Sequence, residues 1–341
     1  MTRAVVVLGL AAWAAGPAPP SPAAAPPARA YLVLPFENTA EDPSLEWLST
    51  GLAHSLGEYL VGFGQQVMDD EERSVLLEGS GIPSGAPLAL ASALELGRKT
   101  LARPAGLRVD RLVLGRFNVD QGDITVAARV IDIQQEKARP WMSRSGRLKD
   151  LLELNRDLAV MLARDEKVAV AGGREELLRK QSEDVPLLAF ETYCRAVTET
   201  DSKKRLQLLR RALQQYPGYP KAAYQAGSLL AREERWEDAA AVLGKASSDP
   251  FPYESDFHLL NAQVALGRRD PQAAMTEARR ALSIADTARG HLLLGRALQA
   301  TGDRAAALAE IERARSADPS DAEIEEFRRT LDEGKSPRRA P

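Results

Sequence analysis

The sequence predicts an α+β domain, a mixed sheet with helices, followed by an all-α region of stacked helical hairpins. In the first half, short apolar runs typical of strands alternate with longer stretches at helical spacing. In the second half, one helix–turn–helix pattern recurs about every 34 residues. A chain of 341 residues is long enough for about two such domains.

An alanine that closes every second helix sets the period of the second half. These alanines lie 34, 35 and 33 residues apart, at Ala212, Ala246, Ala281 and Ala314. Small residues keep a similar spacing in three of the first helices, where two helices would cross closely: Gly227, Ala262 and Gly295. We therefore place four hairpins in residues 187–320 and a capping helix in residues 321–333, with a disordered tail over 334–341.

This spacing resembles the tetratricopeptide repeat (TPR) family, whose period is about 34 residues. The copies that carry the resemblance best are residues 224–246 and 291–319. The first copy departs from the family at Tyr193 and Arg205, and the third at His258 and Asn261. The resemblance implies a TPR solenoid that binds protein partners in a concave groove and performs no catalysis.

The same resemblance places the peptide-binding groove on the first helix of each repeat. Carried over position by position, the groove-lining residues are Lys221, Tyr224, Ser228, Arg232, Gln263, Arg289, Arg296 and Gln299. Four of these eight are basic and none is acidic, which favours peptides with acidic side chains or a C-terminal carboxylate. The alternative is that all eight are merely exposed helix residues.

Residues 1–30 have the features of an export signal followed by a Pro/Ala-rich tail. Arg3 provides a basic start, residues 4–16 form a 13-residue apolar run, and Ala28-Arg29-Ala30 is a small-x-small cleavage site before Tyr31. The run falls short of the ~20 residues that span a bilayer. A second site at residues 23–25 is weaker because Pro26 follows it. We expect a periplasmic or secreted protein that begins near Tyr31 and has no membrane span after cleavage.

Residues 31–165 predict the α+β domain, in the order βαβαβββα. The expected strands cover residues 31–36, 66–77, 111–119 and 124–133, with one more near Trp141, and the expected helices cover 43–63, 88–101 and 148–162. The strand at 66–77 is ambiguous, and a Gly/Pro/Ser loop follows it. This order suggests a mixed sheet with its helices on one face. Residues 166–186 are a linker or a helical connection to the repeats.

Four segments of this domain resemble the amino-terminal domain of the TolB type and its curli-assembly and flagellar relatives, the CsgG/FlgO group. They are residues 33–38, 47–52, 114–117 and 130–133. The resemblance implies a bacterial envelope protein that assembles with partners and has no catalytic residues. The acidic run at 69–72 departs from it, because an apolar strand is more usual there.

The remaining reactive residue types form no catalytic, cofactor or metal motif. His54 and Glu58, four residues apart on a helix, read as a surface pair, whereas His258 and His291 read as partly buried structural groups. The single cysteine, Cys194, reads as buried packing. With 45 basic and 48 acidic residues, no general attraction to nucleic acid is expected.

These patterns predict a non-catalytic scaffold or assembly factor of the bacterial cell envelope, without a cofactor, that binds protein partners within an envelope complex. One alternative is a regulatory subunit of an envelope enzyme or signalling system. An intracellular adaptor is the third reading.

Overall fold

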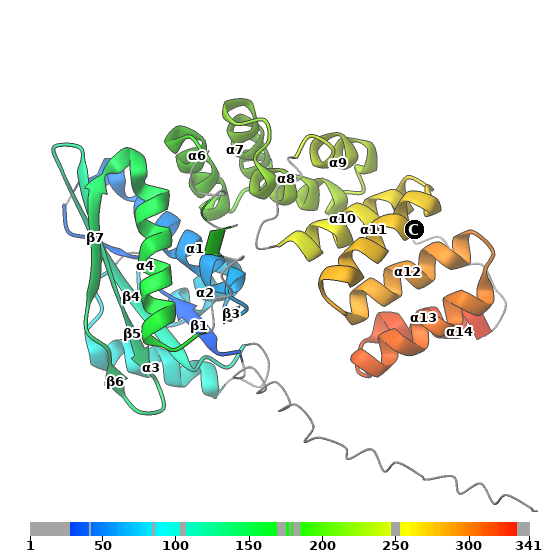
Figure 1. The fold of residues 1–341 in the computed structure, drawn as a ribbon, viewed down its shortest axis with the longest axis horizontal. Helices are drawn as coiled ribbons and strands as arrows, with labels where there is room; N and C mark the ends of the chain where they lie inside the picture. Colours follow the sequence, from blue (N-terminus) through cyan, green and yellow to red (C-terminus); the bar gives the residue numbers. More distant parts are fainter. Residues whose placement is uncertain are drawn as a thin grey trace, which may run out of the picture.

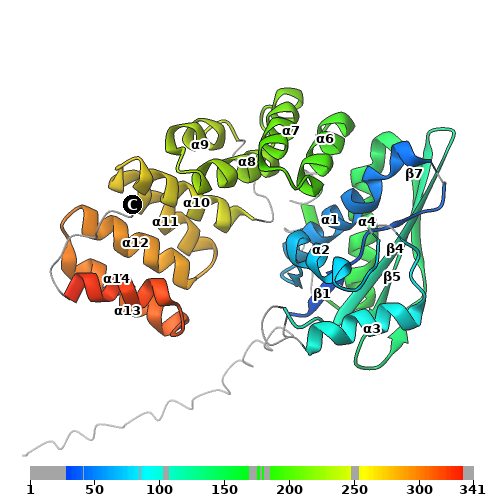
Figure 2. The same ribbon diagram turned by 180° about the vertical axis from the view of Figure 1, so that it is seen from behind.

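The computed structural model describes residues 28–332 apart from 41, 84–85, 103–106, 169–174, 177–178, 180–184 and 247–252. A sheet with its helices occupies the first half, and the described part of the second half is helical and curves away from the sheet as an arc (Figures 1 and 2). The predicted order of an α+β region followed by a helical region is therefore confirmed. Residues 1–27 of the predicted leader and the tail at 334–341 lie outside the described residues, whereas residues 28–30 are described and Ala30 begins β1.

Within the described residues the sheet has seven strands and is mixed, as predicted. The strands are β1 (Ala30–Val33), β2 (Glu37–Asn38), β3 (Gln66–Val67), β4 (Arg111–Asp120), β5 (Asp123–Asp132), β6 (Lys137–Ala138) and β7 (Met142–Arg147). Their order is β3-β1-β4-β5-β6, with β2 beside β4 and β7 beside β5. β1 runs parallel to β3 and β4, whereas β5 runs antiparallel to β4, β6 and β7.

Helices cover both faces of this sheet, so the prediction of helices on one face is wrong. Tyr31 and Val33 of β1 join one apolar core with α1 (Trp47–Gly62) and α4 (Leu151–Asp165). Leu32 of β1 and Leu34, which directly follows the strand, join a second core with α2 (Asp70–Glu78) and α3 (Leu90–Leu101). Successive strand side chains point to opposite faces, and both sets are apolar here, so each face needs its own helices. Short 3-10 turns at Pro43–Leu45 and Leu148–Asp150 precede α1 and α4.

The predicted strand at 66–77 is wrong beyond its first two residues. β3 ends at Val67, and the acidic run that follows begins α2 instead. The carboxylate of Asp69 caps this helix by accepting the backbone N–H of Glu72 at 2.7 Å. Acidic residues are favourable in a first helical turn because they face the positive end of the helix dipole.

The helices of the second half pair as hairpins along the chain. These are α6 (Leu187–Thr198) with α7 (Ser202–Gln215), α8 (Pro220–Arg232) with α9 (Trp236–Leu243), α10 (Glu254–Gly267) with α11 (Pro271–Ile284), and α12 (Ala288–Ala300) with α13 (Arg304–Ala317). The expected capping helix is α14 (Ala322–Asp332), which buries Ile324, Phe327 and Leu331. No helix in the described ranges is both long and apolar enough to cross a membrane.

Close helix crossings occur where the small residues predict them. A Cβ added to Gly227 would lie 2.7 Å from the side chain of Leu243, and one added to Gly295 would lie 3.0 Å from Ile311. Ala262 is fully buried. One predicted closing alanine is misplaced, because α9 ends at Leu243 and Ala246 lies beyond the helix. The other three closing alanines are fully buried within α7, α11 and α13.

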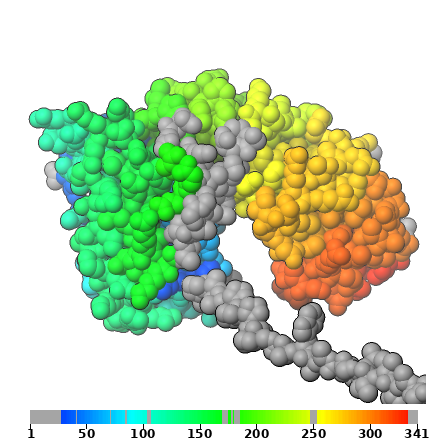
Figure 3. Space-filling model, viewed as in Figure 1, coloured from blue at the N-terminus to red at the C-terminus, as the bar shows by residue number. Residues whose placement is uncertain are grey.

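The sheet domain and the first hairpins share one continuous core. The core on the α1 face continues into α6, α7 and α8, and α1 lies directly against α6. In the space-filling view the helical region continues from this junction to the C-terminal helices as a curved band (Figure 3). The distal helices α12 to α14 have a separate apolar core.

Candidate functional site

Four of the eight predicted peptide-binding residues line a single cavity of about 670 Å³ near the distal end of the arc. They are Gln263 from α10 and Arg289, Arg296 and Gln299 from α12. Its apolar lining comes from Trp236, Leu266, Leu293 and Phe327. Helices α9, α10, α12 and α14 therefore contribute to one site, which we call the distal groove.

Glu323 of α14 also lines the distal groove. It is not among the groove residues predicted from the TPR resemblance. Its carboxylate bridges the two arginines, with one oxygen 2.5 Å from Nη1 of Arg289 and the other 2.7 Å from Nη1 of Arg296. The guanidinium of Arg296 also lies 5.5 Å from the centre of the Phe327 ring. A groove expected to have no acidic residue thus holds two cations and one carboxylate, which leaves a net charge of about +1.

Glu323 could have been found from the sequence. It lies 34 residues after Arg289, which is one repeat period and therefore the equivalent position in the next unit. We assigned α14 only a capping role, so its groove-facing positions were left out.

Two amide side chains complete the polar lining of the distal groove. The Gln263 side-chain oxygen lies 3.5 Å from Nη2 of Arg289. The side-chain oxygen of Gln299 is buried without a hydrogen-bond partner among the described residues. Because an unpaired buried acceptor is unfavourable, Gln299 has an unused capacity to accept an N–H.

The other four predicted residues lie on α8, outside this cavity. Lys221 is engaged within the chain, because its ammonium lies 2.5 Å from the Glu58 carboxylate of α1. Tyr224 stacks on Tyr253 with ring centres 6.2 Å apart and planes inclined by 9°. Ser228 is half-buried, and Arg232 is exposed. The structure therefore does not bring all eight residues into one continuous groove.

The interpretation of His54 and Glu58 as a surface pair is wrong, since both are buried where the sheet domain meets the helical region. Nδ1 of His54 lies 2.5 Å from Asp70, and Nε2 lies 3.0 Å from the hydroxyl of Tyr193 and 3.3 Å from Glu58. Lys221 closes the cluster from α8. The spacing of His54 and Glu58 within α1 gives no information on whether other helices cover them. In the structure, α6 and α8 do so through Tyr193 and Lys221.

The protonation states of this junction cluster are set by mutual pairing. Burial would lower the pKa of His54, but the carboxylates of Asp70 and Glu58 outweigh it and raise that pKa to about 10. Burial would likewise raise the pKa values of Asp70 and Glu58, but the neighbouring cations hold both below their ordinary range. His54 is therefore a cation at neutral pH, which suits it to clamp the two regions together rather than to exchange protons.

Two further sequence interpretations are confirmed. Cys194 is buried, and burial raises the pKa of its thiol well above the ordinary value, so it packs as a neutral side chain. His258 is partly buried and His291 is buried, and they make equivalent contacts one period apart, at 2.7 Å to Glu277 and 2.6 Å to Glu310. No cluster of three or more potential metal-binding side chains occurs in the described ranges.

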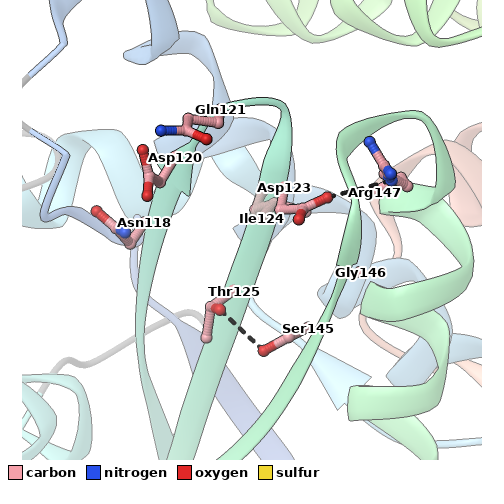
Figure 4. Close-up of a pocket in the computed structure, with 9 residues that line it drawn as sticks. All are labelled: Asn118, Asp120, Gln121, Asp123, Ile124, Thr125, Ser145, Gly146 and Arg147. Atoms are coloured by element: carbon pink, nitrogen blue, oxygen red, sulfur yellow. Dashed lines mark hydrogen bonds and ion pairs between the residues drawn. The ribbon is translucent and has the colours of Figure 1, made fainter.

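A second cavity, of about 640 Å³, lies where the β4–β5 hairpin meets β7 (Figure 4). Four of its polar side chains are paired with each other. Asp123 lies 3.3 Å from Arg147, and the hydroxyls of Thr125 and Ser145 are 2.8 Å apart. Ile124 is the one large apolar side chain of its lining and Arg147 the one arginine, so the distal groove, with four apolar side chains and two arginines, is the stronger candidate.

No protein-family model matches the chain, and no curated protein matches it either. The resemblances to the TPR family and to the TolB and CsgG/FlgO group therefore stay predictions.

Proposed function

We propose that the chain is a non-catalytic scaffold or assembly factor of the bacterial cell envelope that binds an extended acidic segment of a protein partner in the distal groove. The observation that carries this proposal is the pair Arg289 and Arg296 held by the single carboxylate of Glu323. Paired helices at 33-to-35-residue spacing support a TPR solenoid for residues 187–320. The mixed sheet is compatible with a TolB or CsgG-like domain before it.

The charge balance of the groove suits one anionic group of a ligand. Arginine presents a planar fork of donors that matches a carboxylate, and Glu323 uses only one amino group of each arginine. A carboxylate from a partner can add to the pair or take the place of Glu323. The leucines, Trp236 and Phe327 then accept an apolar side chain next to it.

Exchange of Glu323 for a ligand carboxylate costs little. The side chains of Glu323, Arg289 and Arg296 are 41%, 37% and 32% exposed. Ion pairs with this much exposure contribute roughly 0–1 kcal/mol each. Glu323 therefore keeps the arginines in place when the groove is empty and competes only weakly with a partner.

A first experiment combines partner identification with a matched charge control. The purified chain is cross-linked in an envelope extract, and the captured segments are identified by mass spectrometry and made as labelled peptides. Their affinity is then compared between wild type, Arg289→Glu with Arg296→Glu, and Arg210→Glu with Arg279→Glu. The two control arginines are exposed on α7 and α11 and lie outside the groove lining.

We expect the groove variant to lose binding of an acidic peptide at least tenfold, in line with the loss of about 1.4 kcal/mol or more of paired hydrogen bonding. The control variant should bind as wild type does, and circular dichroism should show all three folded. Equal binding by both folded variants rejects the distal groove. A captured catalytic or sensor protein whose activity changes on binding favours the regulatory-subunit alternative.

A further inference from the structure

We propose that the export leader is removed upstream of Arg29, so that Arg29 and Ala30 remain in the mature protein. This inference rests on the proposed export of the chain. The small-x-small pattern at residues 28–30 points to a cut between Ala30 and Tyr31. The contacts of Arg29 and Ala30 contradict that position.

Ala30 is an integral part of the sheet rather than the end of a tail. It is the first residue of β1, is 4% exposed, and pairs in register with Gln66 of β3. Its N–H donates to Oδ2 of Asp110 at 3.1 Å, and its carbonyl accepts the N–H of Asp110 at 2.8 Å. A cut after Ala30 removes both bonds and shortens β1, which lies between β3 and β4 in the sheet.

Arg29 holds the same corner of the domain through its backbone and its side chain. Its N–H donates to Oε1 of Gln65 at 3.0 Å, and its carbonyl accepts the N–H of Gln66 at 3.0 Å. Its guanidinium pairs with Glu166, whose side chain is only 2% exposed. Arg111 and Arg139 also contact Glu166, but loss of Arg29 takes away one of three cations around a buried carboxylate.

The new chain end would itself be unfavourable at Tyr31. Hydrolysis of the bond between residues 30 and 31 consumes one water and leaves a carboxylate on Ala30 and an ammonium on Tyr31. Tyr31 is the register partner of Arg111 on β4. The ammonium would therefore form inside the sheet, where burial disfavours a charged group.

The sequence offers an alternative that avoids this damage. Ser21-Pro22-Ala23 places small residues three and one positions before a cut, and Ala24 follows it. A cut after Ala25 would instead be followed directly by Pro26. We assign cleavage to the bond between Ala23 and Ala24, which leaves five residues ahead of Arg29.

Intact-mass and N-terminal peptide analysis of the exported protein tests this assignment. The full chain is expressed with a C-terminal tag in a bacterium and recovered from the envelope fraction. A mature chain that begins at Ala24 and contains Arg29 and Ala30 is the expected result. A chain that begins at Tyr31 overturns the inference but leaves export intact. Only full-length chain in the cytosol overturns export, and the inference with it.

Two matched substitutions separate the two cleavage sites. Ala23→Leu removes the small residue directly before the proposed cut and should make the precursor accumulate. Ala28→Leu removes the small residue three positions before the rejected cut, at an exposed side chain, and should be processed as wild type. The opposite pattern overturns the assignment. As a separate check, purified chains that start at Ala24 and at Tyr31 should differ in melting temperature, with the shorter chain lower; equal values contradict the role given to Arg29 and Ala30.

Discussion

Replacing Lys221 with methionine tests whether the junction cluster holds the two regions together. Methionine keeps the long apolar stem but removes the ammonium that lies 2.5 Å from Glu58. The Glu58 side chain is fully buried, and removing one partner of a buried ion pair costs about 3–5 kcal/mol. Because His54 stays 3.3 Å from the same carboxylate, we expect the lower end, about 3 kcal/mol. At roughly 2–4 °C per kcal/mol for large domains, the melting temperature should fall by about 6–12 °C.

The measurement is thermal unfolding at pH 7, with a control on the same helix. Arg232→Met removes a cation of α8 that is exposed to solvent, and it should change the melting temperature little. The double variant Glu58→Gln with Lys221→Met leaves no unpaired carboxylate and should recover part of the loss. If Lys221→Met melts like wild type, the pair does not fasten the helical region to the sheet domain.

Three further outcomes are expected. Because the pKa of His54 in the folded protein is raised to about 10, its contribution to stability is complete below the ordinary value of about 6.5 and is lost as pH rises toward 10. The free energy of unfolding should therefore fall between pH 7 and 10, by up to about 1.4 kcal/mol per pH unit, and the melting temperature should fall with it. Both should fall less steeply in His54→Gln. Gly227→Leu should destabilise by about 1–3 kcal/mol in denaturant titration, because even a Cβ would meet Leu243 at 2.7 Å; an unchanged midpoint rejects the close crossing. Glu323→Gln should tighten binding of an acidic peptide by up to about fivefold in fluorescence titration, and weaker binding would show that Glu323 does not compete.

Local signals identified most of the helical region correctly. The period near 34 residues and the small residues at Gly227 and Gly295 reflect contacts between neighbouring helices, which sequence spacing encodes directly. The structure shows two further local signals, at Asp270 and Asp303, because each carboxylate caps a helix by accepting a backbone N–H three residues later at 3.0 Å. The end of α9 was missed because Gly244 terminates the helix before the expected alanine.

Features that depend on packing between distant segments could not be predicted in this way. The continuous apolar run of β1 indicates that both sheet faces need cover, but α2 lies inside a segment that the sequence analysis predicts as a strand. The burial of His54 depends on Tyr193, 139 residues away, and that of Glu58 on Lys221, 163 residues away. No periodicity within α1 distinguishes a charged pair exposed to solvent from one that another domain covers.

The junction also bears on why we propose the distal groove, rather than the rest of the arc, as the binding site of a partner. A helical stack of this kind offers its first-helix positions along its whole length, and Lys221 was predicted as one of them. In the structure, the sheet domain already uses that position, because α1 lies against α6 and supplies Glu58 as the carboxylate that Lys221 binds. At the other end, Glu323 supplies the corresponding carboxylate to Arg289 and Arg296, but from a half-exposed side chain. The chain thus pairs these cations itself at both ends, firmly in the buried junction and weakly in the distal groove, and the weak pairing is the one that we propose yields to the carboxylate of a partner.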